Sequence, residues 1–94
     1  MFIANLTYIR PLDEVDAIIP AHIEFLDRHY ASGDFVASGR KVPRTGGIIL
    51  IAGSDRDKVN AILDQDPFKR EGVATYDVLE FVPTKMQPGL EHFS

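Results

Sequence analysis

Hydrophobic and polar positions alternate or recur along this chain in a way that predicts four strands and two helices. Residues Phe2–Arg10 are rich in apolar and β-branched side chains and end before Pro11, which is typical of a strand. The uninterrupted apolar run IILIA is typical of a strand buried on both faces of a sheet. Before it, Lys41–Gly47 is predicted to be a loop because of its proline and glycines, with Gly46 and Gly47 forming a turn and not a phosphate-binding loop. The strand that contains IILIA is expected at residues 46–53, and the other two strands at residues 34–40 and 73–82.

The start of the first helix depends on Pro20. Asp13 is a candidate N-cap for a helix that begins there, but Pro20 lacks a backbone donor and clashes with the preceding turn. The helix therefore either kinks at Pro20 or begins anew near it. We favour a main helix over residues 20–32, with Gly33 as the left-handed residue that ends it.

The second helix is predicted over residues 55–65. Ser54 and Asp57 resemble a capping box at its start. Its apolar stripe leads to Asp66, where an apolar residue would be expected, and Pro67 prevents the helix from continuing. Residues 68–72 are then a turn. The stripe consists of Val59, Ile62 and Leu63.

The order β-α-β-β-α-β predicts an α+β fold, a ferredoxin-like βαββαβ sandwich. In it, two helices cover one face of a four-stranded antiparallel sheet. We expect one domain over residues 1–83 and a C-terminal tail over residues 84–94. Both sets of alternating strand positions carry apolar residues, so the open sheet face needs a cover. A second copy of the chain is the simplest one, which predicts a homodimer.

Composition narrows the class of protein. The 94 residues are 45% hydrophobic and 26% charged, with a formal net charge of -4, as expected for one small globular domain. Lys and Arg are scattered, which argues against nucleic-acid binding, and no apolar run approaches membrane length. The lack of cysteine excludes disulfides, thiol nucleophiles and Cys-zinc sites. The three histidines lack matching carboxylate spacing, so we expect no metal site, and we expect no cofactor. The start of the chain is too short for a signal peptide, so a cytoplasmic protein is the default expectation.

His22 is the first candidate functional residue. On a helical wheel of residues 18–30 it falls within the apolar arc, while Glu24, Asp27 and Arg28 occupy the opposite face. An ionisable ring aimed at the core needs a hydrogen-bond partner or a functional role.

Asp66 is the matching candidate partner. It follows the second helix, where a carboxylate meets the negative end of the helix dipole at a cost of about 0.3 to 1 kcal/mol. A carboxylate bonded to imidazole fixes the tautomer and raises basicity for proton abstraction. The alternative is purely structural: His22 is a paired core histidine, and Asp66 caps the turn before Phe68. The residues alone leave both interpretations open.

The topology complicates this pairing. The two helices run parallel, so the start of one and the end of the other lie at opposite ends of the domain. His22 meets Asp66 only if the first helix extends upstream of Pro20, if the loop after the second helix folds back, or if the contact crosses a dimer.

Three stretches of the sequence resemble the YciI-like (YCII-related) family over residues 1–83. They are PAHIEFLDRHYASGDFVASG, PRTGGIILIAG and DQDPFKREGVATYDVLEF, which contain Pro-x-His at His22, Ser38-Gly39, and Asp-Pro-Phe at residues 66–68. The resemblance implies a ferredoxin-like protomer that forms a dimeric α/β barrel related to muconolactone isomerase-like proteins. It also implies a candidate active site at His22 and Asp66, with lyase-type elimination on small cyclic or aromatic compounds.

The leading functional hypothesis is a small cofactor-free enzyme of lyase or isomerase type. His22 would act as general base or acid, oriented by Asp66, on a small polar or cyclic metabolite. The alternative is a non-catalytic dimer that binds a small molecule or supports a partner enzyme. The candidate substrate-binding residues are Ser38, Gly39, Arg40, Arg44 and Phe68.

Overall fold

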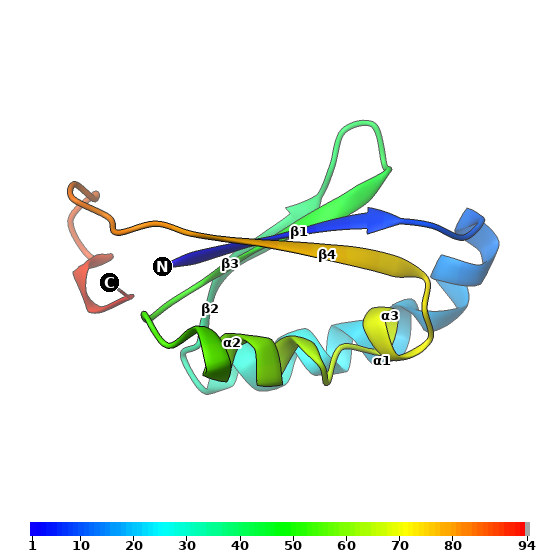
Figure 1. The fold of residues 1–94 in the computed structure, drawn as a ribbon, viewed down its shortest axis with the longest axis horizontal. Coiled ribbons are helices and arrows are strands. Elements are labelled where there is room, and N and C mark those ends of the chain that lie inside the picture. Colours follow the sequence, from blue (N-terminus) through cyan, green and yellow to red (C-terminus); the bar gives the residue numbers. More distant parts are fainter. Residues whose placement is uncertain (94) are drawn as a thin grey trace.

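The computed structural model describes residues 1–93 and confirms the predicted fold class. An antiparallel sheet of four strands, in the order β2-β3-β1-β4, is covered on one face by the helices (Figure 1). This is the ferredoxin-like βαββαβ arrangement. In chain order the elements are β1 (Phe2–Tyr8), α1 (Leu12–Ala31), β2 (Phe35–Arg40), β3 (Gly46–Ile51), α2 (Arg56–Leu63), α3 (Pro67–Arg70), β4 (Ala74–Glu80) and the 3-10 helix η1 (Glu91–Phe93).

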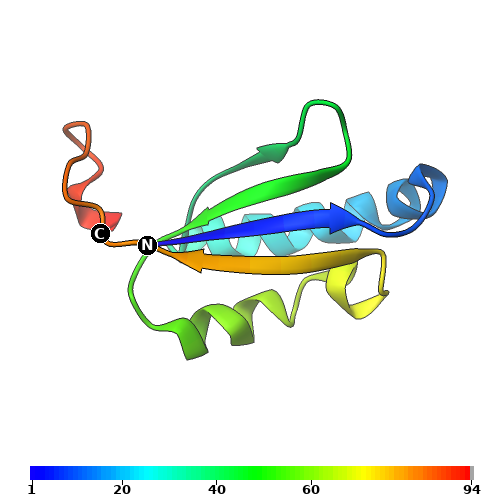
Figure 2. The same ribbon diagram turned by 45° about the horizontal axis from the view of Figure 1, so that its top comes forward.

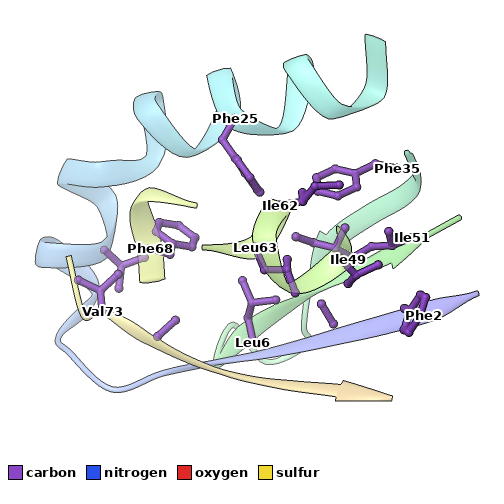
Figure 3. Close-up of a cluster of buried hydrophobic side chains, with 14 residues drawn as sticks. Phe2, Leu6, Phe25, Phe35, Ile49, Ile51, Ile62, Leu63, Phe68 and Val73 are labelled. Atoms are coloured by element: carbon purple, nitrogen blue, oxygen red, sulfur yellow. The ribbon is translucent and has the colours of Figure 1, made fainter. Parts of the chain in front are cut away.

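The hydrophobic core lies between the sheet and the helices. Alternate residues of β1 point toward the helices, beginning with Phe2, which is paired with Ile51 of β3. They meet the fully buried Phe25 of α1 and the aliphatic stripe of α2 (Figure 3). Each large apolar side chain buried in this way contributes about 1.5–3 kcal/mol relative to exposure. The stripe is the predicted one, Val59, Ile62 and Leu63.

The other face of the sheet is open. Ile3 of β1 lies beside Leu50 of β3 and Leu79 of β4, and Leu79 remains 62% exposed. Ile48 on the same face of β3 is 37% exposed, so the expectation that β3 is buried on both faces is not met within one chain. Asn5 adds a buried side-chain oxygen that has no hydrogen-bond partner among residues 1–93. Helices α1, α2 and α3 lie on the opposite face of the sheet (Figure 2).

The favoured start of the first helix at Pro20 is wrong. Helix α1 runs without interruption from Leu12 to Ala31 with Pro20 inside it, and Pro11, not Asp13, is its N-cap. Pro20 has no N–H to offer the preceding turn. Val15 before the proline and Phe25 after it are both fully buried, and their packing keeps both halves of the helix on the sheet.

Two of the predicted helix boundaries need correction and one is confirmed. Gly33 ends α1 at φ 83°, as predicted. The N-cap of α2 is Asp55 and not Ser54, because the Asp55 carboxylate accepts the Lys58 N–H at 3.1 Å. The segment after Asp66 is the short helix α3 and not a simple turn, because Pro67 occupies its first position and Asp66 caps it.

The chain after β4 forms the tail that ends in η1. The Gly53 N–H donates to the Phe93 carbonyl oxygen at 3.3 Å, which brings η1 back to the end of β3. No helix within residues 1–93 is both long and apolar enough to cross a membrane.

Candidate active site

His22 and Asp66 meet within one chain. His22 lies near the middle of α1 with its side chain 12% exposed, and Asp66 is fully buried in the link between α2 and α3. The His22 Nδ1 and Asp66 Oδ1 atoms are 2.8 Å apart. Of the three routes that the sequence left open, the first applies, because α1 extends well upstream of Pro20 and so carries His22 toward the end where α3 packs.

Asp66 accepts hydrogen bonds from two further groups. The Phe68 N–H donates to Oδ1 at 3.0 Å, and the Tyr76 hydroxyl of β4 donates to Oδ2. A buried carboxylate would be costly without partners, and these donors offset the loss of hydration. Since Asp66 is the N-cap of α3, its place at the start of that helix offsets the expected penalty from the dipole of the preceding helix.

These contacts define the tautomer of a neutral His22. A carboxylate only accepts hydrogen bonds, so the Nδ1–H of His22 must donate to Asp66, which leaves the lone pair on Nε2. Nε2 has no hydrogen-bond partner among residues 1–93 and is not enclosed by them. Burial, followed by the charge of Asp66, raises the pKa of Tyr76 well above its ordinary value, which keeps its hydroxyl protonated as a donor.

Phe68 fixes the plane of the His22 ring. The two rings are stacked, with centroids 3.9 Å apart and an interplanar angle of 9°. The ring of Tyr8, in β1, contacts the Phe68 ring edge-on, and the two ring centroids are 5.8 Å apart. The Asp66-Pro67-Phe68 segment therefore supplies both the hydrogen-bond partner and the stacking partner of His22.

The His22 ring borders a cleft of about 440 Å³ between α1 and the sheet. This volume lies in the lower part of the range of about 300–1,000 Å³ that is usual for ligand pockets. Ile19, Leu26 and Ile49 contribute apolar wall. All five predicted substrate-binding residues line the same cleft, namely Ser38, Gly39, Arg40, Arg44 and Phe68.

The polar lining residues differ in how they are held. The Ser38 and Tyr30 hydroxyls are 2.7 Å apart. Arg44, in the loop between β2 and β3, donates to Asp16 of α1. The side chain of Arg40, the last residue of β2, makes no hydrogen bond or ion pair with any other residue in the described part of the chain.

The sequence reasoning missed three polar residues of the site, Tyr8, Asp16 and Tyr76. Tyr76 gave a usable signal: it occupies a buried-face position of a strand, and a buried tyrosine hydroxyl needs a partner. Nothing local marks Asp16, because its role arises from the loop that folds against it. No group of three or more His, Asp or Glu side chains within residues 1–93 is arranged to hold a metal ion.

A second hollow of about 260 Å³ lies between the start of α2 and the tail, and it contains none of the predicted site residues. It is lined by Asp34, Lys58 and His92, among others. Asp34 and Lys58 form an ion pair at 3.0 Å, and the hydrogen bond from Ser32, together with this pair, lowers the pKa of Asp34. His92 thus lies outside the cleft that His22 borders.

The model of the YCII-related domain matches residues 1–82. The chain belongs to the YCII-related domain family. This confirms the resemblance inferred from the three sequence stretches. A search of curated proteins found no match.

Among solved structures, this YCII-related chain is similar to a protein from Burkholderia phenoliruptrix AC1100. That protein is 5-chloro-2-hydroxyhydroquinone dehydrochlorinase, solved in complex with 2,5-dihydroxybenzoquinone. The TM-score is 0.71 at 19% sequence identity, and the match covers 87% of this chain and 94% of the other. At this identity the likeness shows a shared fold.

Proposed function

We propose that this YCII-related protein is a small lyase or isomerase in which His22 is the general base or acid and Asp66 orients it. One observation carries the proposal: His22 Nδ1 is bound to a buried carboxylate, Nε2 has no hydrogen-bond partner among residues 1–93, and His22 lines a largely apolar cleft. Imidazole and carboxylate in this relation are suited to proton transfer near neutral pH. The dehydrochlorinase named above supports a small cyclic compound as the class of substrate.

The proposed step moves one proton. Nε2 of His22 takes a proton from a substrate carbon, the C–H electron pair forms a new double bond, and a leaving group departs with its electrons from the neighbouring carbon. In an isomerisation, the proton returns to a different carbon instead. Asp66 stabilises the imidazolium that forms between these events. Acid–base help of this kind supplies about 10² to 10⁴ in rate, so the substrate needs a C–H bond activated by a carbonyl or similar group.

The five predicted substrate-binding residues then hold the substrate. Phe68, stacked on His22, presents a flat apolar surface, and Ser38 offers a hydroxyl at the cleft. Guanidinium groups at the same cleft suit an anionic oxygen on the substrate.

Replacing His22 by Gln tests the proposal. His22→Gln keeps a polar side chain on α1 and removes the base, so turnover should fall about 10²-fold or more. The assay follows loss of substrate and solvent-deuterium incorporation, by NMR, over a panel of chlorinated hydroquinones and small cyclic hydroxy acids. The matched control is His29→Gln, on the same helix, since His29 bonds to Gln65 and lies outside the cleft.

Two outcomes would contradict the enzymatic proposal. One is turnover that survives His22→Gln at the level of the His29→Gln control. The other is tight binding of panel compounds without conversion of any of them, which would favour the non-catalytic binding module.

We also propose that two chains pair through their open sheet faces. The row of Ile3, Leu50 and Leu79 is continuous across three strands and is left without cover from any helix. Apolar patches of this kind mark interaction sites, and an isologous dimer covers both copies at once. The unpartnered Asn5 oxygen on the same face would gain access to a donor from the second chain.

A further inference from the structure

The two arginines that line the cleft are not equivalent. Arg44 is already paired, because its Nη2 donates to Asp16 Oδ1 at 2.5 Å. Its guanidinium also lies 5.8 Å from the centre of the Tyr8 ring. The hydrogen bond to Asp16 is the main reason why the pKa of Arg44 is raised. Arg44 therefore meets a ligand as half of a neutral pair.

Arg40 meets a ligand as a free cation. It is adjacent to Gly47 across the β2–β3 ladder and lines the cleft on the same side of β2 as Ser38. Within residues 1–93 it has no carboxylate partner, and a guanidinium stays protonated at every relevant pH. Its five donors have a planar geometry that fits a carboxylate, a phenolate or an enolate.

The charged side chains that line the cleft thus leave one uncompensated positive charge. They are Asp16, Arg40 and Arg44, and the negative charge of Asp16 neutralises the positive charge of Arg44. We propose that the cleft selects flat, ring-sized monoanions whose anionic group binds Arg40, and that Asp16 sets this selectivity. The inference rests on the proposed function for the identity of the site, and it adds the charge of the ligand.

Asp16 acts in two ways in this proposal. It occupies the Arg44 guanidinium, so no second anion site is open. The Asp16 side chain is 56% exposed, so a second anionic group that approached Arg44 would also meet the Asp16 carboxylate. The aliphatic wall and the stacked Phe68 ring favour a flat apolar body between the charged end and His22.

Binding of three matched probes tests the proposal: benzoate as monoanion, isophthalate as dianion and benzamide as neutral analogue. Dissociation constants are measured by NMR titration at low salt for the wild-type protein and its variants. The wild-type protein should bind benzoate more tightly than either other probe. Arg40→Gln should weaken benzoate about tenfold, which is the usual size of one charge-assisted hydrogen-bonded contact.

Asp16→Asn is the decisive variant, because it should improve binding. With Arg44 released and the repelling carboxylate gone, isophthalate should bind about three- to tenfold more tightly, and the gain should shrink at high salt. Asp13→Asn is the matched control: it removes the same charge from the first turn of the same helix, away from the cleft.

The proposal is overturned by any of four results. The wild-type protein binds no benzoate, or binds isophthalate as tightly as benzoate. Asp16→Asn changes isophthalate binding no more than Asp13→Asn does. Arg44→Gln weakens benzoate more than Arg40→Gln does.

These binding measurements do not depend on turnover. If His22→Gln leaves turnover intact, the proposed function fails while the charge selectivity stands. If the probes bind without regard to charge while turnover still needs His22, the charge selectivity fails and the proposed function stands.

Discussion

Asp66 has two structural roles that the sequence presented as alternatives. It caps α3 through the Phe68 N–H, as in the structural interpretation, and it also holds His22, as in the functional one. The identity of this pair was predictable, since an acidic residue on an apolar stripe and a histidine in an apolar arc both need partners. Tyr76 was not, because its contact with Asp66 depends on how β4 lies against the α2–α3 link.

Tyr76→Phe should destabilise the protein in a pH-dependent way. Loss of the hydroxyl leaves Asp66 Oδ2 without its donor, which costs about 1–3 kcal/mol near neutral pH. The pKa of Tyr76 is raised above its ordinary value of about 10, so the unfolded chain loses the phenolic proton first. The advantage of wild type over Tyr76→Phe should thus be constant below pH 10 and fall above it, by up to about 1.4 kcal/mol per pH unit.

Urea unfolding of both proteins from pH 7 to 11 measures this difference. Comparing the two proteins cancels the contribution to the pH dependence of stability from the lysines and the other tyrosines, which titrate in the same range. An advantage that stays level or grows above pH 10 would contradict the assignment of Tyr76 as the donor to Asp66.

At the scale of elements, local signals gave the type and order of the helices and strands better than their ends. Gly33 ends α1 as predicted because its left-handed backbone is a local property. Pro20 misled the prediction for the opposite reason, since burial of Val15 and Phe25 on either side of it outweighs the lost backbone hydrogen bond. Tertiary packing therefore determines where this helix begins, and that packing cannot be inferred from a short stretch of the sequence.

The close approach of β1 and β3 gives a prediction at this scale. Gly46 begins β3, and a Cβ atom at this position would overlap the backbone carbonyl oxygen of Leu6. Gly46→Ala should therefore lower the free energy of unfolding by at least about 2 kcal/mol, because backbone cannot move aside as a side chain can.

Gly39→Ala is the control for this substitution. A Cβ at Gly39 has no atom within 4 Å, so its cost should stay within about 1 kcal/mol. Denaturant unfolding of the two variants decides the point, and equal costs would show that the two strands tolerate a wider separation.

At the scale of the whole molecule, alternation along the strands correctly indicated apolar residues on both faces of the sheet. It did not show how exposed they would be, because that depends on which face the helices cover. The strand registers place Leu79 and Ile48 on the face that the helices do not cover. The two hollows were beyond sequence reasoning altogether, since each is formed by segments that are distant along the chain.

Leu79→Glu tests the proposed pairing of open sheet faces. A carboxylate placed in the middle of a buried apolar interface is costly, so this variant should run as a monomer where the wild-type protein runs as a dimer. Size-exclusion chromatography with light scattering measures the mass. Val42→Glu is the control, because Val42 is 93% exposed in the loop between β2 and β3. A wild-type protein of monomer mass, or equal behaviour of the two variants, would refute the dimer.

The hairpin formed by β2 and β3 carries both arginines of the cleft, whereas the imidazole and its carboxylate partner belong to α1 and the α2–α3 link. In the proposed function, the guanidinium groups that bind the substrate thus lie on a different stretch of the chain from the His22–Asp66 pair, whereas Asp16 and Phe68 lie close to that pair in the sequence. Under the proposed function, substitutions near residues 40–44 would change which compound binds while leaving His22 and Asp66 in place. Sequence changes confined to one hairpin could in this way vary ligand recognition in a fold this small.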